Sequence, residues 1–72
     1  MRRIFPGQVW QNGCTAVKIQ DNDGNLELVT FDLNNDTLRF RKSDICSQEK
    51  AQQYLQKLNC KYTTKVLATV EL

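Results

Sequence analysis

The spacing of apolar residues changes once along this chain, after Ser43, and that change restricts the fold more than any other feature. Before it, apolar and polar residues alternate in short runs, which is the repeat of β-strands. After it, "SQEKAQQYLQKLN" carries apolar residues at the i, i+3, i+4 and i+7 spacing of an amphipathic helix, at Ala51, Tyr54, Leu55 and Leu58. The sequence therefore predicts several strands followed by one helix.

Turn-forming residues divide the first part of the chain into four predicted strands. The signals are "PG", "NG", "DNDGN" and "NND", all rich in residues that favour tight turns. The strands are expected near residues 9–10, 14–20, 26–33 and 37–42. Because tight turns join consecutive strands, we expect an antiparallel meander. In the third strand, Leu26 and Leu28 alternate out of phase with Phe31, which predicts a bulge or twist there.

The predicted helix has recognisable ends. Ser47 is a suitable N-cap with Glu49 in the first turn, and Ser43 is an earlier alternative. Asn59 is a suitable terminator. The remaining run, residues 62–72, alternates apolar and polar side chains and predicts one final strand.

These elements predict a mainly β (α+β) fold in a single small domain, residues 1–72. The order of "PGQVW", a twisted hairpin, "VTF", "RFRKSDI", a helical segment and a last strand resembles small SH3-like β-barrels, in which a short helical turn separates the fourth and fifth strands. Since the helix here is several turns long, the alternative is an open curved antiparallel sheet of about five strands with the helix on one face. The expected core residues are Trp10, Val17, Ile19, Phe31, Phe40, Leu55 and Leu58.

The residue types argue against catalytic and metal-binding chemistry. The 72 residues include no histidine, and the three cysteines, Cys14, Cys46 and Cys60, show no C-x-x-C spacing for zinc. "DNDGN" does not have the spacing of an EF-hand loop, so we interpret it as a hairpin turn. We expect no metal, no cofactor and no enzymatic activity. The catalytic alternative is an enzyme that uses Cys14 or a carboxylate.

The cysteine count also bears on the compartment. An odd number of cysteines, with no hydrophobic leader after Met1, is not typical of a secreted disulfide framework. No apolar run approaches the length of about 20 residues that a membrane span needs. We therefore expect a cytoplasmic protein without a membrane partner.

Charge is unevenly distributed, although the formal net charge is only +2. Residues 21–36 contain five acidic residues and no basic one, whereas basic residues dominate on both sides. In "TLRFRKSDI", an extended backbone would point Arg39 and Arg41 away from Leu38 and Phe40. We expect a basic binding patch formed by Arg39, Arg41, Lys42, Arg2, Arg3 and Lys18.

A structural interpretation of the same residues stays open beside the functional one. Arg39 and Arg41 would then only line the solvent-exposed face of a strand and form ion pairs with Glu27 or Asp32 on the neighbouring strand.

The function expected from these features is a non-catalytic binding or regulatory protein that docks onto another protein. Small phage or mobile-element proteins that modulate a host machine have this size, by analogy. The alternative is a nucleic-acid-binding small barrel that places its basic strand face on phosphates. A homodimer through the edge of the final strand is a further expectation. The sequence does not identify the partner.

Overall fold

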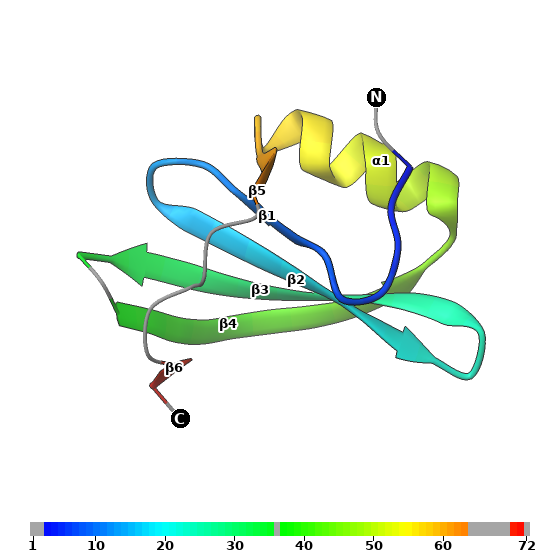
Figure 1. Ribbon diagram of the computed structural model, residues 1–72, viewed down its shortest axis with the longest axis horizontal. Coiled ribbons are helices and arrows are strands. Elements are labelled where there is room, and N and C mark those ends of the chain that lie inside the picture. The colour runs from blue at the N-terminus through cyan, green and yellow to red at the C-terminus, as the bar shows by residue number, and fades with distance from the viewer. Residues whose placement is uncertain (1–2, 36, 64–69, 72) are drawn as a thin grey trace.

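The computed structural model describes residues 3–35, 37–63 and 70–71, and it shows a curved sheet with one helix across one face (Figure 1). The elements are β1 (Val9–Gln11), β2 (Thr15–Asn22), β3 (Asn25–Asn34), β4 (Thr37–Cys46), α1 (Gln48–Lys57), β5 (Lys61–Thr63) and β6 (Val70–Glu71). Their order in the sheet is β5-β1-β2-β3-β4-β6. The first five strands pair antiparallel, and the two-residue β6 joins β4 in parallel. The predicted mainly β class, with a helix between β4 and β5, is confirmed.

The sheet is open, so the predicted barrel is wrong and the open-sheet alternative is correct. β5 and β6 lie at opposite edges, and no pairing within the described ranges joins them. A ten-residue helix forms about three turns. Because α1 lies across one face, it occupies the space across which the two edges would have to meet.

The predicted final strand after the helix is confirmed as β5, but its predicted extent over residues 62–72 is corrected, because the described residues of this run lie in two strands. Lys61–Thr63 pairs with β1 at one edge of the sheet, whereas Val70–Glu71 pairs with Leu38 and Arg39 of β4 at the other. One straight strand cannot lie at both edges. Residues 64–69 and 72 lie outside the described residues.

The predicted helix ends are confirmed. The Ser47 hydroxyl accepts a hydrogen bond from the Lys50 amide, and the earlier start at Ser43 is wrong because Ser43 lies in β4. At the other end, Asn59 adopts a left-handed φ of 59°. The Cys60 and Asn59 amides then donate to the Leu55 and Gln56 carbonyls, the pattern of a Schellman motif.

The hairpin turn between β2 and β3 is confirmed. Asp23 and Gly24 both have positive φ, 53° and 84°, as the central pair of a type I′ turn requires. The resulting β2–β3 register runs without a shift from Asn22 with Asn25 to Thr15 with Asp32.

Apolar side chains form two clusters, on opposite faces of the sheet. The helix-side cluster holds Ile4, Trp10, Val17, Ile19, Leu28, Ala51, Leu55 and Cys60, with Leu58 packed against it. The second cluster, on the reverse face, holds Ala16, Val29, Phe31 and Leu38. The single predicted core is therefore corrected: Phe31 belongs to the second cluster, and Phe40 is 54% exposed because its strand lies near the edge.

The phase change in β3 has a different cause from the predicted one. Leu28 and Thr30 are buried on the helix side, and Val29 and Phe31 are buried on the reverse face. A central strand covered on both faces carries apolar residues in both phases. The irregularity that does occur lies in the pairing with β4, at Thr30 and Phe31, where the extra residue is on β4.

Candidate functional site

Among the strands whose burial the structure describes, β4 is the most exposed, with eight of its ten residues exposed. On its inner side β4 pairs with β3 along its whole length, but on its outer side β6 pairs only with Leu38 and Arg39. From Arg41 to Cys46, no strand in the part of the chain that the structure describes pairs with the outer edge. This strand therefore offers both side chains and backbone groups to a partner.

A β-bulge gathers the basic residues of β4. Lys42 pairs with Thr30 and Phe40 pairs with Phe31, so Arg41 is the extra residue between the two pairs. Strict alternation would place Arg41 and Lys42 on opposite faces. The bulge instead lets both reach the helix side, as their contacts with Asp32 and Tyr54 show.

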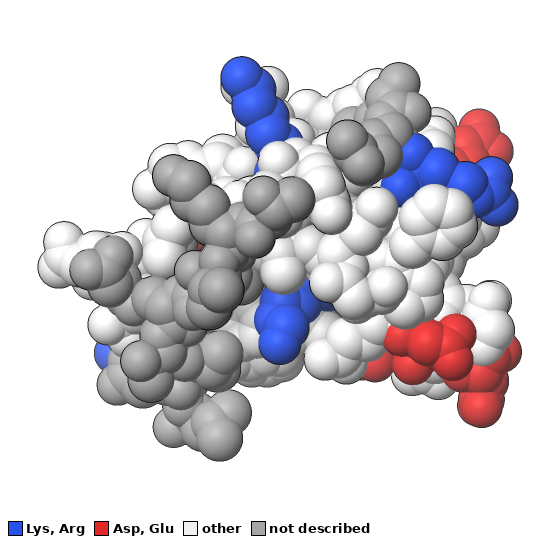
Figure 2. Space-filling model, viewed as in Figure 1, with Lys and Arg blue, Asp and Glu red and all other residues white. Residues whose placement is uncertain are grey.

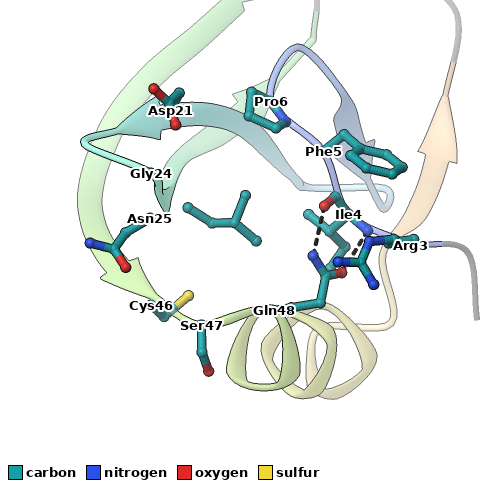
Figure 3. Close-up of a pocket in the computed structure, with 11 residues that line it drawn as sticks. Arg3, Ile4, Phe5, Pro6, Asp21, Gly24, Asn25, Cys46, Ser47 and Gln48 are labelled. Carbon is teal, nitrogen blue, oxygen red and sulfur yellow. Dashed lines mark hydrogen bonds between the residues drawn. The ribbon is translucent and has the colours of Figure 1, made fainter.

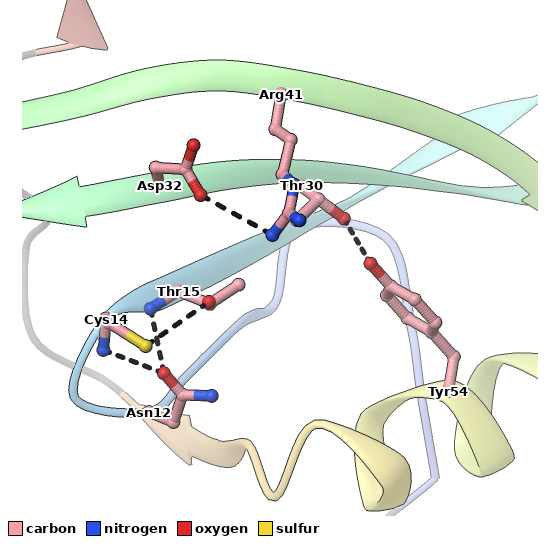
Figure 4. Close-up of polar contacts among 7 residues, drawn as sticks. All are labelled: Asn12, Cys14, Thr15, Thr30, Asp32, Arg41 and Tyr54. Carbon is pink, nitrogen blue, oxygen red and sulfur yellow. Dashed lines mark hydrogen bonds and ion pairs between the residues drawn. The ribbon is translucent and has the colours of Figure 1, made fainter.

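Acidic side chains lie among these basic ones. Arg41 Nη1 lies 3.6 Å from Asp32 Oδ1, and Lys42 Nζ lies 3.4 Å from Asp44 Oδ2 (Figure 4 shows the first pair). The four side chains are 51–59% exposed, so each ion pair contributes no more than about 1 kcal/mol. The predicted cross-strand ion pair of Arg41 is thus confirmed, with Asp32 as its partner.

The position of Arg39 is set by register. Its neighbour on β3 is Asp32, and its neighbour on β6 is Glu71. Each strand beside Arg39 therefore carries an acidic residue at the position that pairs with it. We call Arg39, Arg41 and Lys42 the basic row. Together with the neighbouring carboxylates of Asp32 and Asp44, the basic row forms a surface of mixed charge.

A partly buried hydrogen bond fixes the helix to the sheet beside the basic row. The hydroxyl oxygens of Thr30 and Tyr54 lie 2.8 Å apart, and Thr30 is 1% exposed (Figure 4). Lys42 Nζ lies 5.1 Å from the centre of the Tyr54 ring, within cation–π distance. Tyr54 thus links α1 to β3 and supports Lys42.

The other predicted site residues do not join the basic row. Lys18 pairs with Val9 and Val29, which places it on the reverse face of the sheet. The Arg3 guanidinium lies 5.8 Å from the centre of the Phe5 ring, and Arg3 lines a pocket with Cys46 and Ser47, at the C-terminal end of β4. Arg2 lies outside the described residues. Figure 2 accordingly shows basic side chains at separate places on the face in view.

Two exposed apolar side chains of β4 were missed as surface residues by the sequence analysis. Phe40 and Ile45 are 54% and 57% exposed, and their partners Phe31 and Glu27 place them on the reverse face. The Phe40 ring packs edge-on against Phe31, with ring centres 6.2 Å apart. The alternation in "TLRFRK" predicts the phase of Phe40, but nothing local indicates that its face is left open.

A cavity of about 300 Å³ lies between the N-terminal segment and the start of α1 (Figure 3). Gln48, in its wall, donates from Nε2 to the Ile4 carbonyl at 2.8 Å and accepts at Oε1 from the Ile4 amide at 2.7 Å. Its polar atoms therefore hold the N-terminal segment in place. This contact explains why Ile4 is buried in the helix-side cluster.

The cysteines lie at different depths in the fold, with Cys14 exposed and Cys60 buried. Cys14, Cys46 and Cys60 are free thiols. Burial raises the pKa of Cys46, with a further rise from Asp44, and Lys50 opposes it. Burial also raises the pKa of Cys60, with a smaller rise from nearby Cys14. A raised pKa keeps these two thiols protonated, which is the opposite of nucleophilic activation.

The residues that the structure describes contain no group of three or more metal-ligating side chains that could hold an ion. They also contain no helix long and apolar enough to cross a membrane.

Comparison with known proteins adds no assignment. No protein-family model, no curated protein and no solved structure matches this chain.

Proposed function

We propose that this protein is a non-catalytic binding or regulatory protein that docks onto another protein through β4. The observation that carries the proposal is that acidic side chains lie among those of the basic row. Asp32 lies within 4 Å of Arg41, and Asp44 lies within 4 Å of Lys42. A surface of mixed charge is complementary to another protein surface of mixed charge, and such pairing favours specific recognition.

The same observation weighs against the nucleic-acid alternative. Affinity for phosphates depends on cations that can release counterions from the nucleic acid. Two of the three basic side chains in the row already have carboxylate partners, and Arg3 and Lys18 lie elsewhere on the surface. The row therefore supplies few cations to a phosphate backbone.

The order of the elements and the free cysteines support two further parts of the proposal, the kind of binding module and the compartment. The order of four meander strands, a helix and a short β5 is similar to that of small SH3-like binding modules, with an open sheet in place of the barrel. The three free thiols fit a reducing compartment, so we place the protein in the cytoplasm.

The experiment is quantitative capture from a lysate of the source organism. The tagged wild-type protein is compared with the double variant Arg39→Glu/Arg41→Glu, and captured proteins are quantified by mass spectrometry. We expect the variant to lose at least one protein that the wild type captures reproducibly, because two charges facing the partner are reversed. Circular dichroism checks that the variant is folded.

The matched control is Lys57→Glu/Lys61→Glu, which makes the same change in net charge at exposed positions away from β4. Capture that the control retains and the β4 variant loses would support the proposal. Identical capture by all three proteins would refute a docking role for the basic row.

A further inference from the structure

The outer edge of β4 combines three features that together suit pairing with another strand. From Arg41 to Cys46, it has no strand partner among the residues that the structure describes. Phe40 and Ile45 expose more than half of their surface on the reverse face. Lys42 and Asp44 stand two positions apart on the helix side, with Ser43 between them. An exposed edge of this kind is a template for pairing with another strand.

A second copy of β4 fits this edge in one register. A two-fold axis perpendicular to the sheet makes the pair antiparallel and sets residues of the same face opposite one another. An axis at Arg41, Lys42 or Asp44 would place that charge opposite itself. An axis at Ile45 would leave a single residue of β4 before the chain leaves the strand.

An axis at Ser43 avoids both problems. It places Lys42 of each copy opposite Asp44 of the other, so two cross-strand pairs of opposite charge form around a small central residue. It also brings Ile45 of each copy beside the bulge at Phe40 and Arg41 of the other. Both exposed apolar side chains then gain an apolar neighbour across the interface.

We infer that the protein forms a symmetric homodimer by antiparallel pairing of β4 with β4, centred on Ser43. The two sheets become one continuous sheet, with both helices on the same face. The sequence predicts a dimer contact at the edge of the final strand, whereas this inference places the contact at the edge of β4. It does not depend on the identity of the docking partner, although the dimer would present the basic row twice.

The test is sedimentation velocity of the purified protein from low micromolar to near-millimolar concentration. We expect a reversible monomer–dimer equilibrium. Lys42→Asp and Asp44→Lys should each weaken dimerisation at least about tenfold, because each reverses one member of both cross-strand pairs. Lys57→Asp, an exposed charge reversal on α1, should leave the dimer unchanged.

Mixing the two variants separates pairing from a general effect of charge. Lys42→Asp protein mixed with Asp44→Lys protein should form a heterodimer near wild-type strength, since all opposed charges are again complementary. The double exchange Lys42→Asp/Asp44→Lys should restore the homodimer. Circular dichroism establishes that each protein is folded.

Two results would overturn the inference. A wild-type protein that stays monomeric throughout would show that the charges of β4 only protect its edge from pairing. A dimer that both single variants leave unchanged, or that the mixture fails to restore, would show that another surface or register forms the contact.

Discussion

Replacing Tyr54 by phenylalanine should destabilise the protein by more than the loss of an ordinary surface hydroxyl. The Tyr54 hydroxyl is bonded at 2.8 Å to the Thr30 hydroxyl, which is 1% exposed. Removing one partner leaves the buried Thr30 hydroxyl without a hydrogen bond, which costs about 1–3 kcal/mol. A 72-residue domain has a free energy of unfolding of only about 4–11 kcal/mol. The expected loss is therefore a large fraction of the total.

The second half of the experiment is a double-mutant cycle. Thr30→Val alone should also destabilise the protein, because it leaves the Tyr54 hydroxyl without this partner. The double variant Tyr54→Phe/Thr30→Val should recover most of the loss, since it removes both polar groups and keeps their shape. Thr37→Val, at an exposed threonine of β4, is the matched control and should change stability by no more than about 0.5 kcal/mol.

The assay is urea denaturation followed by circular dichroism, with thermal melting as a second measure. Each 1 kcal/mol lost should lower the midpoint temperature by about 4–8 °C for a domain of this size. A neutral Tyr54→Phe variant, or single-variant losses that add fully in the double variant, would refute this hydrogen bond as the link between α1 and β3.

Three further predictions concern the hairpin, a thiol and an ion pair. Asn12→Ala should lower the free energy of unfolding by about 1–3 kcal/mol. Asn12 Oδ1 accepts hydrogen bonds from the Cys14 and Thr15 amides, and Asn12 Nδ2 donates one to the Leu58 carbonyl, each at 2.8 Å. An unchanged midpoint in urea denaturation would contradict this. The raised pKa of Cys60 means that the unfolded thiol ionises first, so stability should be fully present below pH about 9 and fall as pH rises toward the folded pKa. Cys60→Ala should flatten that fall relative to wild type, and parallel pH profiles would show that the thiol does not cause it. Arg41→Ala should cost no more than about 1 kcal/mol, and a loss that persists in high salt would disprove a surface ion pair as its cause.

The strands β1–β4 and the helix follow from local signals. The Asp23–Gly24 turn, the Ser47 cap and the Asn59 terminator each depend on the conformational preferences of one or two residues, which short stretches of sequence carry. The end of the chain does not follow in this way. Its alternation indicates extended structure, but no local signal separates Lys61–Thr63 at one edge from Val70–Glu71 at the other.

The candidate site was predictable only in part, for the same reason. The alternation in "TLRFRK" predicts that Arg39 and Arg41 lie opposite Phe40, and the acidic third strand predicts a partner for Arg41. The bulge that brings Lys42 to the same face depends on how β3 and β4 pair. The separation of Arg3 and Lys18 from the basic row likewise depends on the order of the strands. The sequence pattern shows neither the β3–β4 register nor the strand order.

The measurement that tests the proposed protein-docking role most directly is fluorescence anisotropy of labelled single-stranded DNA, duplex DNA and RNA, titrated with the protein at low and at near-physiological salt. Because acidic side chains accompany the basic row, we predict no binding, or binding at low salt that disappears at the higher salt. Binding that persists at near-physiological salt and is lost in Arg39→Glu/Arg41→Glu would contradict the account and make β4 a nucleic-acid interface.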